Sequence, residues 1–276
     1  MKCTKCSREN LGDGKFCSHC GAPLRFMIKN KILEQIQRGE KALGMTITEP
    51  SEELVELAGH MGLDFISLDG QHSTFSPEAV ESLCRIADGY GITPTMRVPD
   101  QYESTILRYL DRGVMLIVVP NLQTKEQAEA LVRNSYFAPK GLRSETSIRT
   151  IFNMGGQRRK EGDRAERMAD INAVTMVVPQ LESTTALENL DGILEVEGID
   201  YFAGGVGDLA QSMGLPGQPS HPEVQRAWRQ AMEKIRVAGK GLPFEDSIES
   251  IRVIDVVYDS VEELLEKHGR KPQISW

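Results

Sequence analysis

Short apolar runs rich in β-branched residues alternate with longer amphipathic stretches along most of the chain. A short apolar run bounded by turn residues is typical of a buried strand, whereas apolar residues that recur every three or four positions indicate a helix with one buried face. The pattern predicts strands at Leu43–Thr48, Phe65–Leu68, Thr93–Val98, Met115–Val119, Val174–Pro179, Tyr201–Ala203 and Arg252–Val257. It predicts helices between them at Glu52–Met61, Pro77–Tyr90, Gln101–Arg112, Lys125–Asn134, Thr185–Val196 and Pro222–Ala238. This alternation is typical of an α/β fold with a parallel sheet.

Composition narrows the class of protein. Hydrophobic residues make up 40% and charged residues 26% of the 276 positions, as in an ordinary soluble globular protein. No stretch approaches the roughly 18 consecutive apolar residues of a membrane span, and the N-terminus has no secretory signal. We therefore expect a cytoplasmic protein without membrane contact. A net charge of −8 argues against nucleic acid as the main partner.

Two Cys-x-x-Cys pairs, Cys3 with Cys6 and Cys17 with Cys20, lie near the N-terminus. Together they can present four thiolates to one tetrahedral zinc ion, and so short a segment needs a metal to fold. The segment resembles the short zinc ribbons of many bacterial proteins, so we expect a ribbon at residues 1–26 and a second domain at 27–276. Four thiolates would close the zinc shell, which favours a structural site over redox chemistry. The ribbon is rich in Lys and Arg, which makes it a candidate docking element for a protein partner.

Polar residues gather where the expected strands end, and in parallel α/β folds that edge carries the chemistry. Glu182 and Asp208 follow two neighbouring strands, and two such carboxylates are suitable ligands for a hard divalent ion. An acid in this position is also a common helix cap, so the pair alone leaves both interpretations open. The missing lysine in the expected strands argues against a Schiff-base mechanism.

Asp69 and His72 lie within one turn of each other after a strand, so the carboxylate could orient the imidazole for proton transfer. A turn-capping Asp beside a surface His is the alternative. Arg97 ends another strand, where its guanidinium could bind a carboxylate or an enolate oxygen, or stabilise structure alone.

Several motifs follow one another in a fixed order. They are Leu68-Asp69-Gly70-Gln71-His72, Met96-Arg97-Val98-Pro99, Val118-Val119-Pro120-Asn121, Ala138-Pro139-Lys140-Gly141-Leu142-Arg143, Gln180-Leu181-Glu182, Gly205-Val206-Gly207-Asp208-Leu209 and a Met213-to-Val224 segment rich in Gly and Pro. In this order they resemble the HpcH/HpaI aldolases, the class II pyruvate aldolases, across about residues 28 to 240.

The resemblance implies a TIM-type (β/α)8 barrel in which Glu182 and Asp208 bind Mg²⁺ or Mn²⁺, with Gln180 beside the metal. It implies a lyase that reversibly cleaves a 2-keto-4-hydroxy acid to pyruvate and an aldehyde through a metal-stabilised enolate. Arg97 would then neutralise the enolate oxygen, and Asp69 and His72 would handle protons. The keto acid's carboxylate would be bound by the backbone N–H groups of Gly205, Val206, Gly207 and Asp208.

The sequence departs from this family at three places. Gln71 occupies a position that is usually Glu, and the turn from Gly205 to Asp208 has a second Gly where the family has Pro-Ala. After Lys240 one C-terminal βα unit is shortened or missing, which would leave strand edges unpaired. Irregular chain, a partner subunit or rearranged strand pairing could close this gap, and the tail Ser260–Trp276 is a candidate for it. Because helix exchange between subunits occurs in the family, we also expect a homo-oligomer.

Two other functions remain open on the sequence. A condensing enzyme of the citrate-forming type would keep the metal and the enolate but change the second substrate. A catalytically weakened barrel retained as a binding or scaffold protein would fit Gln71 and the shortened C-terminus, whereas the intact set of Asp69, His72, Arg97, Glu182 and Asp208 opposes it.

Overall fold

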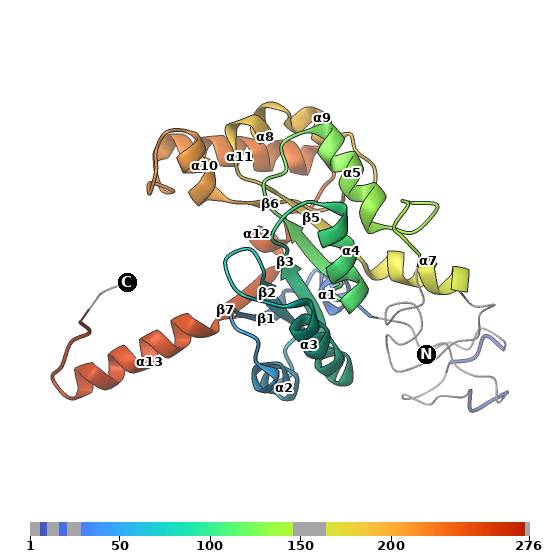
Figure 1. The fold of residues 1–276 in the computed structure, drawn as a ribbon, viewed down its shortest axis with the longest axis horizontal. Helices are drawn as coiled ribbons and strands as arrows, with labels where there is room; N and C mark the ends of the chain where they lie inside the picture. Colours follow the sequence, from blue (N-terminus) through green and yellow to red (C-terminus); the bar gives the residue numbers. More distant parts are fainter. Residues whose placement is uncertain (1–5, 10–16, 21–28, 146–163, 274–276) are drawn as a thin grey trace.

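The computed structural model describes residues 6–9, 17–20, 29–145 and 164–273, and its centre is one curled parallel sheet (Figure 1). The strands are β1 (Ala42–Ile47), β2 (Phe65–Asp69), β3 (Thr93–Arg97), β4 (Leu116–Val119), β5 (Met176–Leu181), β6 (Ala203–Gly204) and β7 (Ile248–Arg252). Their order across the sheet is β6-β5-β4-β3-β2-β1-β7, with every pair parallel. Consecutive strands are neighbours and the last returns to the first, which is the order of a TIM-like barrel.

Helices alternate with the strands, and most of them cover the outside of the sheet. They are α1 (Lys31–Arg38), α2 (Glu52–His60), α3 (Pro77–Tyr90), α4 (Glu103–Arg112), α5 (Lys125–Ser135), α7 (Arg164–Val174), α8 (Thr184–Glu188), α9 (Leu190–Leu194), α10 (Val206–Ser212), α11 (Pro222–Val237), α12 (Pro243–Asp246) and α13 (Val253–Lys267). Side chains at Ser51, Ser76 and Thr124 accept backbone N–H groups where α2, α3 and α5 begin, as expected of N-caps. The helix predicted at Thr185–Val196 is divided at Asn189 into α8 and α9.

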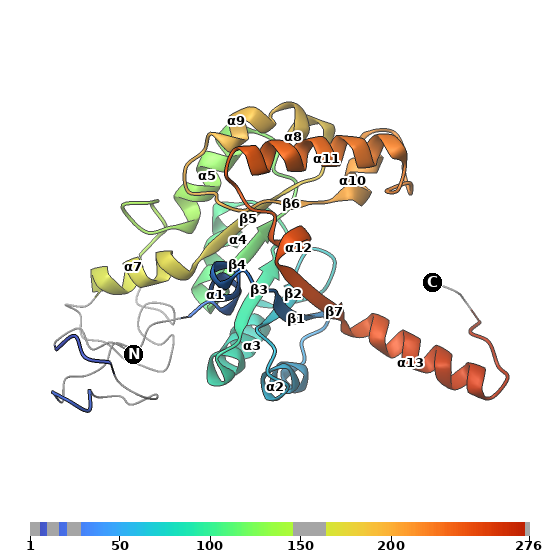
Figure 2. The ribbon, with the colours of Figure 1, turned by 180° about the vertical axis from the view of Figure 1, so that it is seen from behind.

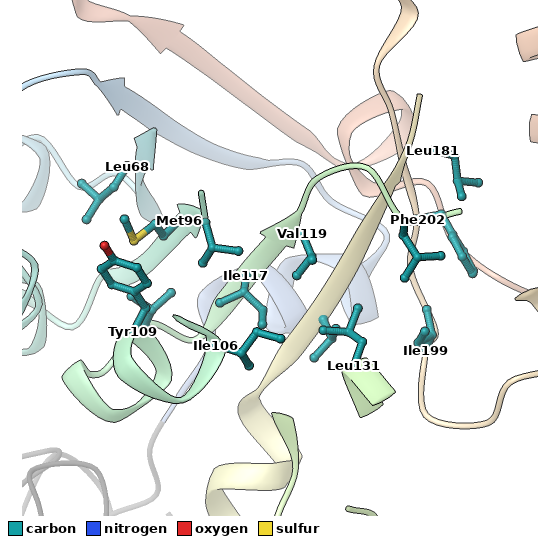
Figure 3. Close-up of a cluster of buried hydrophobic side chains, with 14 of the residues drawn as sticks. Leu68, Met96, Ile106, Tyr109, Ile117, Val119, Leu131, Leu181, Ile199 and Phe202 are labelled. Carbon is teal, nitrogen blue, oxygen red and sulfur yellow. The ribbon is translucent and has the colours of Figure 1, made fainter. Parts of the chain in front are cut away.

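Each strand separates two apolar layers because successive side chains point to opposite faces. The outer layer packs sheet against helices and includes Leu68, Met96, Ile117 and Phe202 (Figure 3). The inner layer fills the barrel with residues such as Phe65. Gly44 makes room for that ring, because a Cβ there would lie 2.4 Å from it.

Helix α1 covers the end of the barrel where the strands begin. Ile32 belongs to the inner apolar layer. Asn30 caps α1 and donates from Nδ2 to the carbonyl of Val174 at 2.8 Å, while the Lys31 N–H donates to Thr93 Oγ1 at 2.8 Å. Because this end is filled with apolar side chains, the other end, where the strands finish, is the one that can admit a ligand.

The C-terminal part of the barrel differs from the prediction. Arg252–Val257 is not a strand: β7 is Ile248–Arg252, and the chain turns helical at Val253. β7 pairs with β1 along its whole length. The strand position between β6 and β7 is represented in the described residues by one parallel bridge between Tyr201 and Gly241, so the expected shortening of one βα unit is confirmed.

The tail does not close this gap among the residues that the structure describes, which leaves closure by a partner subunit as a prediction. Helix α13 extends away from the sheet in both views (Figures 1 and 2). None of its residues is buried, although it carries a stripe of apolar side chains that includes Ile254, Val257 and Leu264. Among the described helices, none combines the length and apolar character needed to cross a bilayer.

Candidate active site

The interior of the barrel changes from apolar to polar along each strand. On β5, Met176 and Val178 belong to the inner apolar layer. Gln180 and Glu182 continue the same alternation and therefore face the interior. Asp69 and Arg97 end β2 and β3 in register with each other. The expectation that these polar groups meet at the carboxyl ends of the strands therefore agrees with the strand register.

Asp69 and Arg97 form a two-point ion pair. Arg97 donates from Nη2 to Asp69 Oδ2 at 2.6 Å and from Nε to Oδ1 at 3.1 Å. The N–H groups of Gln71 and His72 also donate to Oδ1, at 3.1 and 3.3 Å. Burial opposes ionisation of Asp69, but Arg97 and these two N–H groups outweigh it and lower the pKa of this carboxyl. Asp69 is therefore held as an anion in a two-point contact with Arg97.

This arrangement differs from the expected pairing of Asp69 with the His72 imidazole. The carboxylate contacts the backbone of His72 and not its ring. The ring is exposed, and it has no hydrogen bond to any residue that the structure describes. Gln71, which stands at the usual Glu position, has a buried Oε1 without a donor among the described residues. The His72 ring and Gln71 Oε1 could therefore form hydrogen bonds with a ligand or a water molecule.

Glu182 is a buried carboxylate with one oxygen bound and the other free. Its residue is 6% exposed. Oε1 accepts the N–H of Asn121 at 2.7 Å, whereas Oε2 is buried without a donor in the described part of the chain. Burial raises the pKa of Glu182, and the negative charge of Asp208 adds to this rise, against the opposing effects of the Asn121 N–H and Arg97. A cation next to Oε2 would compensate the charge of this buried oxygen.

Asp208 lies in the first turn of α10, which begins after Gly205. It is exposed, and its charge acts on Glu182, so the two carboxylates share one electrostatic environment. The N–H groups in the first turn of a helix have no carbonyl within the helix to accept them. Those of Val206, Gly207 and Asp208 are in this position and are suitable for an anionic group.

Gly205 crosses directly over Glu182. A Cβ at Gly205 would lie 2.4 Å from Glu182 Oε2 and 2.7 Å from Gln180 Nε2, so only glycine fits. Gln180 donates weakly from Nε2 to the carbonyl of Gly204 at 3.4 Å, and its Oε1 is buried without a donor among the described residues. Free carboxylate and amide oxygens on one face are the ligands that Mg²⁺ and Mn²⁺ prefer. The residues present therefore fit a hard divalent cation between Glu182 and Asp208.

One residue of this site was not predicted. Asn121 has a left-handed backbone, with φ 54°, and supplies the N–H that binds Glu182. The only sequence signal was an Asn directly after a strand and Pro120, since Asn tolerates this conformation better than other non-glycine residues.

A second cluster lies far from the barrel in sequence. The Sγ atoms of Cys6, Cys17 and Cys20 all lie within 4.8 Å of one another, and those of Cys6 and Cys17 are 3.6 Å apart. The His19 N–H donates to Cys17 Sγ at 3.4 Å. Cys3, the fourth predicted ligand, lies outside the described residues. Three of the four predicted thiols are thus brought together.

The fold is a TIM-like barrel, and acidic side chains follow the strands at its carboxyl end. The model of the HpcH/HpaI aldolase/citrate lyase family matches residues 43–266, so the chain belongs to this family. It is 33% identical over 219 residues to the 2-keto-3-deoxy-L-rhamnonate aldolase of Klebsiella pneumoniae subsp. pneumoniae, covering 79% of each chain. Because its named relatives are aldolases, the chain is an enzyme of the lyase class.

Solved structures agree on the fold. The HpcH/HpaI aldolase from Desulfitobacterium hafniense DCB-2 is similar with a TM-score of 0.76 and 20% identity, over 91% of this chain and 100% of that one. A citrate synthase, SbnG, is similar with a TM-score of 0.73 and 24% identity, over 86% of this chain and 96% of that one.

Gly205→Ala should weaken Mn²⁺ binding by at least about 10-fold, because the new methyl group displaces Glu182 Oε2 from the position facing the cation. Gly207→Ala is the matched control, since a Cβ there meets no atom within 4 Å. Titration of each folded variant with Mn²⁺, followed by the paramagnetic signal of the free ion, measures the affinities. Equal affinities in the two variants would contradict the proposed position of the cation.

Proposed function

We propose that this protein is a divalent-metal-dependent aldolase that reversibly cleaves a 2-keto-4-hydroxy acid to pyruvate and an aldehyde. The observation that carries the proposal is the free, buried Oε2 of Glu182 beside Asp208, at the mouth of a barrel whose relatives are named 2-keto-3-deoxy-L-rhamnonate aldolases. The described strands contain no lysine, which supports metal chemistry over a Schiff base.

Mg²⁺ or Mn²⁺ held by Glu182 and Asp208 would act as a Lewis acid that polarises the ketone of the substrate. Metal-dependent chemistry is general among class II aldolases of this family, and the donor set described above suits it. Gln180 would orient a water or a substrate oxygen through its free Oε1.

The other side chains would bind the substrate and move its protons. Asp69 pins Arg97 through Nε and Nη2, which leaves Nη1 without a partner among the described residues and available to the developing enolate oxygen. The exposed His72 ring would transfer the proton at C3, and the N–H groups of Val206, Gly207 and Asp208 would bind the carboxylate. The expected N–H of Gly205 is not available for this, because it donates to the carbonyl of Leu181 at 3.2 Å. A fixed guanidinium loses little freedom on binding, so it is an efficient stabiliser of the oxyanion.

The protein should exchange the methyl protons of pyruvate with deuterated solvent when Mg²⁺ or Mn²⁺ is present, because proton removal precedes the choice of aldehyde. Glu182→Gln and Asp208→Asn should each abolish the exchange, whereas Arg97→Ala should bind Mn²⁺ normally and lose about 10² to 10³ in rate. His72→Ala should slow exchange with little change in pyruvate affinity. Proton NMR of the methyl signal measures all four variants.

Glu188→Gln is the control for this series, since Glu188 is an exposed acid on α8 that is not among the proposed site residues. It should exchange pyruvate protons at the unmodified rate. If the metal-loaded, unmodified protein shows no exchange, both the aldolase and the citrate-forming alternative are wrong, and a binding or scaffold role takes their place.

For the N-terminal cluster we propose a structural zinc ion bound by Cys3, Cys6, Cys17 and Cys20. Three Sγ atoms within 4.8 Å match the ligand spacing of a tetrahedral thiolate site, and the His19 N–H bonded to Cys17 Sγ is the type of contact that stabilises a thiolate. The basic surroundings of this site suit a docking role toward an acidic protein surface.

Purified protein should contain one zinc ion per chain by elemental analysis, because four thiolates form a closed shell. Cys17→Ser should lose most of this zinc. Cys84→Ala should retain it, since Cys84 is buried in the outer apolar layer. Zinc-free unmodified protein, or Cys17→Ser with its full zinc content, would remove the assignment.

We also propose that the enzyme is a homo-oligomer in which α13 packs on a second copy of the chain. Ile254, Val257, Val261 and Leu264 form one exposed apolar stripe, and Asp255, Asp259 and Glu262 lie on the opposite side of the helix. A helix with such a stripe gains little from projecting into water, so a partner surface would cover it.

Replacing Val257 and Val261 with Glu should shift the protein toward monomers in light-scattering measurements, because two charges would be buried in the interface. Asp259→Lys, on the opposite side of α13, should keep the original mass. A monomeric unmodified protein, or an unchanged mass in the double variant, would contradict the role of this stripe.

A further inference from the structure

We propose that Asn121 is a positioning residue that fixes Glu182 for the divalent cation through its left-handed backbone. This inference rests on the proposed metal site and adds to it a residue that binds neither metal nor substrate. The metal ligand and Asn121 come from different loops, 61 positions apart in the chain. Their contact therefore depends on the geometry of the barrel mouth.

The N–H of Asn121 points at Glu182, and the left-handed φ of this residue lets the loop after β4 leave that N–H in place. Asn121 has φ 54° immediately after β4 and Pro120, a conformation that side chains with a Cβ disfavour and that Asn tolerates. In this conformation the N–H lies 2.7 Å from Glu182 Oε1. Strand β4 holds the chain before Asn121, and the contact with Gln123 holds it after. A residue with an ordinary φ would therefore have to rotate the peptide unit between Pro120 and Asn121, which would turn the N–H away from Glu182 and leave the carboxylate free to rotate.

The side chain and carbonyl of Asn121 hold this conformation in place. Oδ1 accepts from Gln123 Nε2 at 2.7 Å, and the carbonyl accepts a longer bond from Gln101 Nε2 at 3.4 Å. Gln123 is itself anchored, since its carbonyl accepts Asn189 Nδ2 at 2.9 Å. Loops that follow β3, β4 and β5 therefore meet at one residue, and such convergence is what maintains an uncommon backbone conformation.

The two oxygens of Glu182 therefore have different roles at the proposed metal site. Oε1 accepts the Asn121 N–H, which leaves Oε2 as the oxygen available to the cation. The same contact holds Oε2 in one orientation. Groups that orient a ligand in this way commonly change metal affinity by about 10- to 100-fold when they are removed. The same contact also compensates part of the burial of this carboxylate, which burial alone would tend to keep protonated.

The test compares Asn121→Gly with Asn121→Ala in the full-length protein, using Mn²⁺ alone as the probe. Glycine keeps the left-handed conformation and the N–H but loses the bond to Gln123, so its affinity should stay within about threefold of the unmodified protein. Alanine differs from it by one methyl group that disfavours this conformation, and it should bind Mn²⁺ about 10- to 100-fold more weakly. Raising the Mn²⁺ concentration should restore most of the pyruvate exchange of Asn121→Ala, because the loss is in binding the metal. Thermal unfolding of both variants identifies any general loss of structure.

Three outcomes distinguish the claims. Weak binding by alanine together with tight binding by glycine supports the inference. If the unmodified protein binds Mn²⁺ and the two variants bind it with equal affinity, whether unchanged or equally weakened, the role of the backbone conformation is overturned. The proposed metal site is then left intact. Unmodified protein that binds no Mn²⁺ overturns the metal site and this inference together.

Discussion

A carboxylate inside a barrel needs a compensating partner for each oxygen, because a buried charge without one is expensive. Glu182 has such a partner for Oε1, in the N–H of Asn121, and none among the described residues for Oε2. Arg97, the basic side chain whose charge acts on Glu182, is already held by Asp69. The geometry of the mouth follows from this one group: Gly205 must lack a side chain to pass it, and Asn121 must adopt an uncommon backbone to bind it. A divalent cation between Glu182 and Asp208 would complete the compensation.

The rest of the fold leaves one end of the barrel for chemistry. α1 and the inner apolar layer fill the end where the strands begin, and polar residues appear on the same inward face toward the other end. The strand pairing of the barrel is least complete beside β6, where a single bridge to Gly241 replaces a strand. β7 nevertheless pairs fully with β1. In the order of the sheet, the shortened unit lies between β6 and β7, away from the strands β2 and β3 that carry Asp69 and Arg97. Those two central strands are intact.

The sequence predicted the strands and helices whose burial pattern is periodic, among them Pro77–Tyr90, which is α3. It failed at Arg252–Val257, where a run of β-branched residues is typical of a strand. The run belongs instead to a helix whose apolar stripe is not buried by any of the described residues. The position of the candidate site residues at the carboxyl ends of the strands could be predicted, because parallel strands bring these ends together, and their roles stay predictions. Their contacts could not be predicted: Asp69 binds Arg97 and not the His72 ring, and the left-handed Asn121 leaves almost no signature in the sequence.

The central claim is that Glu182 and Asp208 bind one cation that the substrate shares. A crystal structure of the enzyme with Mn²⁺ and oxalate, a stable mimic of the pyruvate enolate, tests it most directly, because the anomalous signal of manganese locates the ion independently of the protein. The account predicts one Mn²⁺ bound to Glu182 Oε2 and to Asp208, with Glu182 Oε1 still on the Asn121 N–H and Arg97 on an oxalate oxygen. Manganese bound elsewhere, or oxalate in the mouth with no metal between the two carboxylates, would contradict it.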